Sequence, residues 1–285
     1  MKTIAILMLI AIGAANATVN AIVSVLPEKT FVDAIGGDKV HTTVMVLPGN
    51  SPHAYEPKPS QMKEISKADI YFAIGVEFEA AWLPKFANQN RQMVIVDLSK
   101  GVIKSAIKAH HHPRKKTQTK HAHQDESLDP HIWTSPANVK VIAAHIYQAL
   151  IAQDPENSDY YKKRYEAFLR HADATDKQIK TILTHTPEGA KFMVFHPAWG
   201  YFAKAYNLTQ IAIEAGGKNP KPKQVIHLIK EAKEEQVKAV FTAPEFSQKV
   251  AEQIAKEVGV PVVAISPLNP NWSQNLIGLA KAIAQ

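Results

Sequence analysis

The feature that most constrains the fold is a regular alternation of short apolar runs and helical segments, which occurs twice along the chain. The apolar runs predict strands at 21–25, 42–46, 70–74, 93–97, 191–195, 210–213, 238–242 and 261–265. Helical segments are expected at 59–67, 79–86, 138–152, 198–206, 222–235, 247–257 and 272–284. Strands that alternate with helices favour parallel sheets. We therefore expect an α/β protein of two lobes, each with a parallel sheet close to a (βα)4 unit.

A long uninterrupted segment separates the two halves. Residues 155–185 contain no Gly or Pro after Pro155, which follows Asp154 as at a helix start. Apolar and aromatic side chains at 161, 165, 168 and 169 recur with helical spacing. About 28 helical residues would span roughly 40 Å. We expect a stiff backbone helix at 154–186 that joins an N-terminal lobe, 18–153, to a C-terminal lobe, 187–285.

The N-terminus follows the pattern of a secretory signal peptide. Lys2 supplies the positive start, residues 3–12 the apolar core, and Ala15-Asn16-Ala17 a small-x-small cleavage site. The apolar run is too short to span a bilayer comfortably, and a buried N-terminal helix is the alternative. We expect residues 1–17 to be removed and the mature chain to be periplasmic and not embedded in a membrane.

Two features of the composition exclude whole classes of chemistry. The chain has no cysteine, which excludes disulfides, thiolate ligands, cysteine catalysis and a lipid anchor on an N-terminal cysteine. We therefore expect a protein that is not a lipoprotein, and a metal site must use His, carboxylate or water. The formal net charge of +7 would suit a nucleic-acid partner. Export argues against nucleic acid, and the lysines spread along the helices indicate a solvated surface.

Three histidines lie in loops that follow predicted strands. His53 stands in SPHAYEPKPS, His131 in DPHIWTSP and His196 in FHPAWGYF. Open α/β sheets bind ligands beyond the carboxyl ends of their strands, so two facing lobes would bring these loops to one cleft. Imidazole is a ligand for zinc and its first-row neighbours. The sequence thus predicts a metal site of these three histidines between the lobes.

A loop at about 105–128 is dense in His, Lys, Gln and Thr and lacks hydrophobic periodicity, so we expect it to be mobile. It carries His110, His111, His112, His121 and His123. These histidines would form an accessory site that captures metal with low affinity or senses excess metal. The alternative is a solvated linker whose histidines bind metal only adventitiously.

Several motifs together carry a resemblance to a known family. They are LPGNSPH at 47–53, YEP at 55–57, KAD at 67–69, DPHIW at 129–133, FH at 195–196 and PK at 222–223. With them, nearly the whole chain after residue 17 resembles the zinc and manganese branch of the substrate-binding proteins of bacterial ABC importers, the cluster A-I family. Within that branch the chain is most similar to the high-affinity zinc-uptake binding proteins.

The resemblance implies a binding protein for Zn2+, the transported ligand, that delivers it to a membrane permease served by a cytoplasmic ATPase. It assigns His53 and His131 as ligands from the N-terminal lobe and His196 as the third, where manganese-preferring relatives tend to carry Glu. Three imidazoles also suit zinc better than the harder manganese ion. The chain has no Walker A sequence, so ATP hydrolysis would belong to the partner. We expect a monomer.

The resemblance leaves the fourth ligand open. Many relatives place an Asp after the last strand, whereas Ser266 stands there in this chain, and a serine hydroxyl is a poor zinc ligand. Water, a histidine from the loop or another carboxylate could fill the position. Glu79 is a candidate to hydrogen-bond one of the ligand histidines from outside; a plain surface or helix role is the alternative.

Other functions also fit three histidines. Uptake of manganese, nickel, cobalt or copper is one, since imidazole binds first-row metals in general, and a periplasmic metal store is another. A zinc hydrolase or hydratase would use the open coordination position for catalysis. Against an enzyme, the sequence contains neither H-E-x-x-H nor G-x-S-x-G, the motifs that would organise such chemistry.

Overall fold

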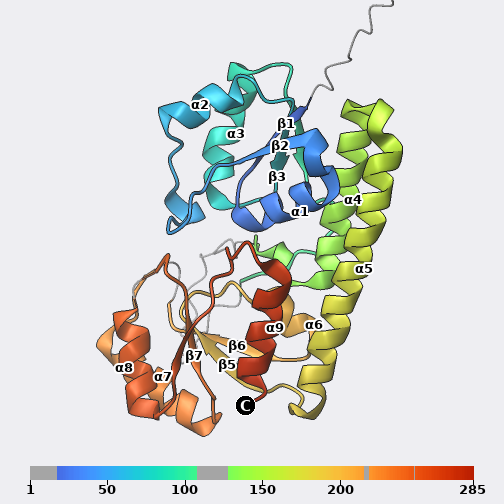
Figure 1. Ribbon diagram of the computed structural model, residues 1–285. Helices are drawn as coiled ribbons and strands as arrows, with labels where there is room; N and C mark the ends of the chain where they lie inside the picture. The colour runs from blue at the N-terminus through green and yellow to red at the C-terminus, as the bar shows by residue number, and fades with distance from the viewer. Residues whose placement is uncertain (1–17, 108–127, 215–217, 247) are drawn as a thin grey trace, which may run out of the picture.

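The computed structural model describes residues 18–107, 128–214, 218–246 and 248–285. Within them lie two parallel four-stranded sheets, ordered β2-β1-β3-β4 and β6-β5-β7-β8, one in each half of the chain (Figure 1). The strands are β1 Val19–Val23, β2 Val40–Val44, β3 Ile70–Ala73, β4 Val94–Asp97, β5 Lys191–Val194, β6 Thr209–Ala212, β7 Val240–Thr242 and β8 Val262–Ala264. The expected two-lobed α/β fold with parallel sheets is therefore confirmed. The expected signal peptide and the five histidines between 110 and 123 lie outside the described residues.

Each sheet is buried at its centre and open at one edge. All four residues of β3 are buried, because helices cover both faces of a parallel sheet. In contrast, β4 and β8 are edge strands, and all of their residues are exposed or half-buried. The first two strands begin two residues earlier than expected. Met45 and Val46 nevertheless continue the ladder, since their N–H groups donate to the Val23 and Ser24 carbonyls at 2.9 Å.

The helices follow the expected order, with one addition. They are α1 Leu26–Gly36, α2 Pro59–Ile65, α3 Glu77–Gln89, α4 Pro136–Gln153, α5 Ser158–Ile182, α6 Gly200–Ala205, α7 Pro222–Glu234, α8 Lys249–Val258 and α9 Trp272–Ile283. The addition is α1, which follows the first strand and for which the sequence predicted no bounds. Its boundary signals are ordinary ones, since Pro27 lies in the first turn and Gly37, with φ of 57°, follows the last residue.

Helix α5 is the long connection expected from the uninterrupted segment. It has 25 residues, which corresponds to roughly 37 Å, and short 3-10 turns at Pro155–Asn157 and Leu183–His185 extend it at both ends. Tyr161, Phe168 and Ala172 lie on its buried stripe. Figure 1 shows α5 beside α4, running along one side of the molecule past both sheets. A helix packed on both halves acts as a common spine rather than as a flexible linker.

The last helix returns to the first. In α9, the Trp272 ring lies 5.6 Å from the Phe31 ring of α1, edge to face, and 6.5 Å from the Phe168 ring of α5. The Thr30 hydroxyl donates to the Pro270 carbonyl at 2.7 Å. One hydrophobic core consequently includes buried side chains from both halves, while a smaller core fills the other face of the C-terminal sheet.

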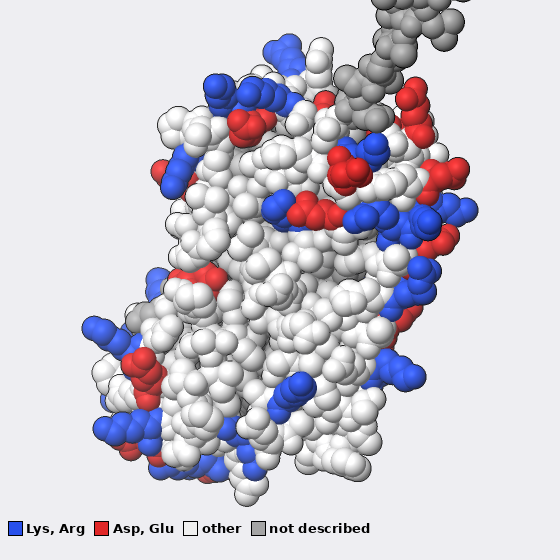
Figure 2. All heavy atoms as spheres, in the orientation of Figure 1, with Lys and Arg blue, Asp and Glu red and all other residues white. Residues whose placement is uncertain are grey.

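The surface carries charges of both signs. In the view of Figure 2, Lys and Arg alternate with Asp and Glu along the side formed by the long helices and at the outer ends of the molecule, and few charges lie in the middle. This face shows no continuous basic stripe of the kind that nucleic acid requires. Among the described helices, none has the length and apolar character needed to cross a membrane.

Candidate metal centre

The three predicted histidines come from three separate loops. His53 lies in a 3-10 turn, η2 Pro52–Ala54, whose start is capped by the Ser51 side chain. His131 immediately precedes a second 3-10 turn, η3 Ile132–Thr134. His196 follows β5 by two residues. Each loop comes after the carboxyl end of a strand, as expected for ligand sites in open α/β sheets.

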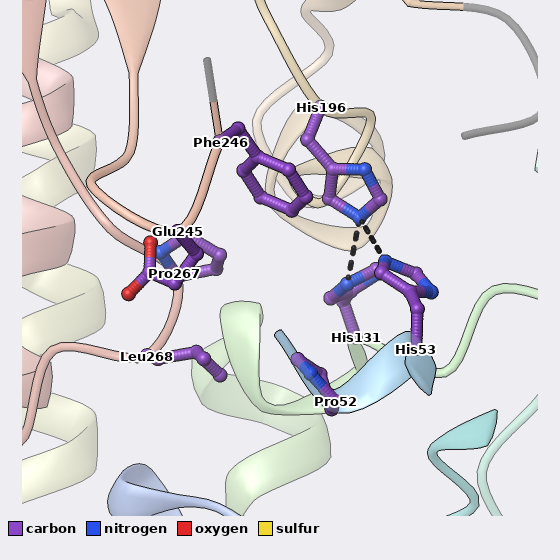
Figure 3. A pocket seen from close by; sticks show the side chains of 8 residues that line it. All are labelled: Pro52, His53, His131, His196, Glu245, Phe246, Pro267 and Leu268. Atoms are coloured by element: carbon purple, nitrogen blue, oxygen red, sulfur yellow. Dashed lines mark hydrogen bonds between the residues drawn. The ribbon is translucent and has the colours of Figure 1, made fainter. Parts of the chain in front are cut away.

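The structure brings these three side chains together. The Nε2 atom of His196 lies 3.1 Å from Nε2 of His53 and 3.3 Å from Nε2 of His131 (Figure 3). Of all the described His, Asp and Glu side chains, only these form a group that could hold a metal ion, with their ligand atoms within 4.8 Å of one another. A tetrahedral zinc ion with Zn–N bonds of about 2.0–2.1 Å has ligand–ligand edges of about 3.3–3.4 Å. The observed spacing is therefore close to that of a tetrahedral ion's ligands.

A carboxylate holds the outer nitrogen of each imidazole. The Nδ1 atom of His53 lies 2.9 Å from Oε1 of Glu77, that of His131 lies 2.8 Å from Oδ1 of Asp129, and that of His196 lies 2.6 Å from Oε1 of Glu214. A proton on each Nδ1 satisfies the carboxylate and leaves the lone pair on Nε2. Such partners fix the tautomer and orientation of metal-binding histidines and increase their basicity.

Burial distinguishes the three pairs. The side chains of His131 and Asp129 are each 3% exposed and those of His196 and Glu214 are 7% and 5% exposed, whereas His53 and Glu77 are 31% and 40% exposed. The site is thus closed on two sides, and His53 stands at its solvent edge.

The same difference appears in the pKa values. The hydrogen bond with Glu77 raises the pKa of His53 above its ordinary value, although burial acts in the opposite direction. Burial lowers the pKa of His196, and the hydrogen bond with Glu214 offsets only part of this effect. Partial burial acts to raise the pKa of Glu77, but the hydrogen bond and charge of His53 leave it lower than usual. Protons therefore compete for His53 before they compete for His196.

The carboxylate partners were not predicted, and the one candidate was wrong. Glu79 does not reach a histidine: it accepts hydrogen bonds from the Ser24 hydroxyl and from the N–H groups of Ile74 and Gly75. The partner on α3 is Glu77, two residues earlier. A sequence signal existed for Glu214, since Val194 pairs with Ala212 in the parallel register. Glu214 therefore follows its strand by two residues, just as His196 follows β5.

The fourth side of the site is largely apolar. Phe246 stacks on the His196 ring at 4.5 Å, and Pro52, Pro267 and Leu268 complete the pocket (Figure 3). Glu245 also lines it, and Figure 3 shows its carboxylate on the side away from the imidazoles. Most of the wall opposite the imidazoles is therefore apolar.

Ser266 is engaged elsewhere. Its hydroxyl donates to Oε1 of Glu245 at 2.7 Å and accepts a hydrogen bond from the Leu268 N–H at 3.0 Å. Within the part of the chain that the structure describes, no carboxylate oxygen joins the three Nε2 atoms. The fourth position is open to a small ligand or to a side chain outside the described residues.

Two tryptophans join the halves beside the site. The indole N–H of Trp133 donates to the Pro267 carbonyl at 2.8 Å, and that of Trp272 donates to the Trp133 carbonyl at 2.7 Å. Trp133 also lies edge to face with His131 at 5.4 Å. The residues flanking His131 are thereby tied to the C-terminal half.

The chain also matches a known protein family. A family model described as "ZnuA: Zinc-uptake complex component A periplasmic" matches residues 22–285. The chain belongs to this family. Its members are metal-binding components of transport systems and not enzymes, so the hydrolase alternative is excluded.

Individual relatives agree with this assignment. The chain is 28% identical over 254 residues to the high-affinity zinc uptake system protein ZnuA of Bacillus subtilis, covering 87% of this chain and 78% of the relative. It is 28% identical over 242 residues to the manganese ABC transporter substrate-binding lipoprotein scaA of Streptococcus gordonii, covering 81% and 73%. It is 26% identical over 265 residues to the zinc-binding protein AdcA of Streptococcus pyogenes, covering 89% of this chain but about half of AdcA (51%).

Solved structures of the family share the fold. A crystal structure of ZnuA superposes with a TM-score of 0.84 at 38% identity, covering 94% of this chain and 98% of that one. A zinc-bound ZnuA from which residues 138–173 of its own chain were deleted superposes equally well, covering 94% and 97%. Several relatives are named lipoproteins, which runs against the expectation that this chain carries no lipid anchor.

Proposed function

We propose that this protein is the substrate-binding component of a high-affinity zinc ABC importer, which captures Zn2+ outside the cytoplasmic membrane and delivers it to the permease. His53, His131 and His196 would be the ligands. The observation that carries the proposal is the convergence of three Nε2 atoms at 3.1 and 3.3 Å, each from an imidazole held by its own carboxylate.

Zinc fits this set of donors better than manganese does. Three neutral imidazoles form a nitrogen-rich site, which suits zinc, whereas manganese favours carboxylate, carbonyl and water oxygens. No described carboxylate oxygen lies among the three nitrogens. Relatives named for zinc and for manganese both occur, so the choice of metal rests on the ligands of this chain.

The surroundings of the site suit capture followed by release. The apolar side chains of Phe246, Pro267 and Leu268 line the pocket and would shield a bound ion from water, which would strengthen its interaction with the imidazoles. His53, at the solvent edge, would be the first ligand to dissociate from the ion. Delivery would then need only a rearrangement that separates His53 from the two buried ligands.

The remaining expectations complete the proposal. Residues 1–17 would be the signal peptide, 18–153 and 187–285 the two lobes, and 154–186 the linking helix. The histidines at 110, 111, 112, 121 and 123 would add a low-affinity accessory site. The mature protein would act as a monomer.

Calorimetric titration with zinc and with manganese tests the function. We expect one tight zinc site that is lost in His196→Ala, with manganese bound more weakly. The matched control is His41→Ala, since His41 is an exposed residue of β2 away from the site. Tighter manganese than zinc binding would refute the zinc assignment. Equal loss in both variants, or tight binding that survives His196→Ala, would refute the site.

A further inference from the structure

We propose that Tyr201 is a positioning residue of the metal centre. From α6 in the C-terminal half, it fixes the Asp129 segment and thereby the orientation of the His131 imidazole. This inference rests on the proposed function, because it concerns the same three-histidine site. It adds a residue that touches neither the ion nor a ligand.

The Tyr201 hydroxyl is joined to two points of the N-terminal half. It donates to the Asp129 carbonyl at 2.8 Å and accepts a hydrogen bond from the Ser105 N–H at 3.2 Å. The side chain is only 4% exposed, and buried hydrogen bonds of this kind are costly to leave unmade. The hydroxyl thus bridges the backbone at Ser105 and the backbone at Asp129.

Those two segments are also paired with each other. The Asp129 N–H donates to the Ser105 carbonyl at 2.8 Å, and Ala106 and Leu128 form an antiparallel bridge. Removal of the tyrosine hydroxyl would leave this pairing in place. The segment would lose this hydrogen bond to the C-terminal half but would keep its local structure.

Gly200 provides a second contact at the same place. A Cβ atom added to Gly200 would lie 2.7 Å from Oδ2 of Asp129, closer than side chains normally approach. The Asp129 carboxylate cannot easily turn away, since its Oδ1 accepts hydrogen bonds from both the N–H and the Nδ1 of His131. Gly200 therefore lies against the carboxylate of Asp129, and Tyr201 holds its backbone carbonyl by a hydrogen bond.

The consequence is that one short segment controls two ligands. His196 supplies a ligand directly, and Gly200 and Tyr201, four and five residues later, seat the carboxylate that orients His131. A displacement of this segment relative to the N-terminal half would disturb both ligands together. The affinity of the site is thereby linked to how closely the two halves are docked.

Tyr201→Phe tests this role, with Tyr206→Phe as the matched control. Tyr206 follows the same helix, and its hydroxyl donates to Asp176 of α5 at 3.0 Å, away from the metal site. Zinc affinity is measured by competition with a chromophoric chelator, and site geometry by the visible d–d absorption of bound cobalt(II). Thermal unfolding of the metal-free proteins checks that each variant is folded.

We expect Tyr201→Phe to weaken zinc binding about three- to tenfold, less than the 10- to 100-fold typical for a residue that contacts a ligand directly. Its cobalt(II) spectrum should change, and Tyr206→Phe should match the wild type in both measurements. Gly200→Ala, which presses on the same carboxylate, should alter the spectrum in the same way. Wild-type affinity and spectrum in Tyr201→Phe, or equal effects in Tyr206→Phe, would overturn the inference. Failure of the wild type to bind zinc would instead refute the proposed function.

Discussion

Replacement of each carboxylate by its amide should reveal which imidazoles the protein holds firmly. The variants Asp129→Asn, Glu214→Gln and Glu77→Gln keep the shape and an acceptor oxygen while they remove the negative charge. In the wild type the three carboxylates lie at similar distances from Nδ1, namely 2.8, 2.6 and 2.9 Å. They differ in exposure, at 3%, 5% and 40%. Distance alone predicts that the three variants lose equal zinc affinity. Burial predicts a large loss for Asp129→Asn and Glu214→Gln and a small loss for Glu77→Gln.

The expected magnitudes follow from that exposure. Loss of an outer partner of a metal-binding histidine costs about 10- to 100-fold in affinity, or about 1.4 to 2.7 kcal/mol, and this should hold for Asp129→Asn and Glu214→Gln. Water screens the pair formed by Glu77, and exposed ion pairs contribute about 0 to 1 kcal/mol. Glu77→Gln should therefore weaken zinc binding less than about fivefold.

Chelator competition at one pH and ionic strength, with all three variants and the wild type side by side, measures the three losses. A loss for Glu77→Gln as large as for the buried pair would show that burial does not set the contribution. No loss in any variant would show that the carboxylates do not act on the metal site at all.

Two further predictions concern pH and stability. Zinc affinity should fall as the pH decreases through about 6.5, because protons compete with zinc for Nε2. The pKa of His53 is raised, so the loss of affinity should begin at a higher pH than for an isolated imidazole. Glu77→Gln should move the start of this loss to lower pH. Affinity that stays constant from pH 8 to about 5 would contradict a site of three imidazoles. Trp272→Phe removes the 2.7 Å hydrogen bond to the Trp133 carbonyl and should destabilise the fold by about 1 to 3 kcal/mol. Urea unfolding measures this, and an unchanged midpoint would argue against the bond as a link between the halves.

Most of the fold could be predicted because hydrophobic periodicity is local. Each strand or helix shows its own hydrophobic spacing within a short stretch of sequence. The uninterrupted run that becomes α5 is recognised in the same way. The strand ends were less certain, since pairing at Met45 and Val46 continues beyond β2. No bounds were predicted for helix α1 although Pro27 and Gly37 mark its ends, because its apolar residues directly continue those of the first strand.

Only the central part of the candidate metal site could be predicted from the sequence. His53, His131 and His196 stand in recognisable motifs after strands, so topology alone was enough to suggest that they meet. Their carboxylate partners depend on side-chain reach, which sequence spacing does not reveal. Glu77 and Glu79 stand two residues apart on α3, yet one contacts His53 and the other ties Ser24 to the start of that helix.

The contact between the first and last helices has a consequence for how the chain is made. Thr30 and Pro270, which share a hydrogen bond, are separated by 240 positions, and Phe31 packs against Trp272. Contacts between such distant residues close late in folding. While the chain is being synthesised, the face of α1 that carries Thr30 and Phe31 cannot pack against α9 until α9 has emerged. The face of α1 that packs against α9 therefore stays uncovered until the end of the chain has emerged.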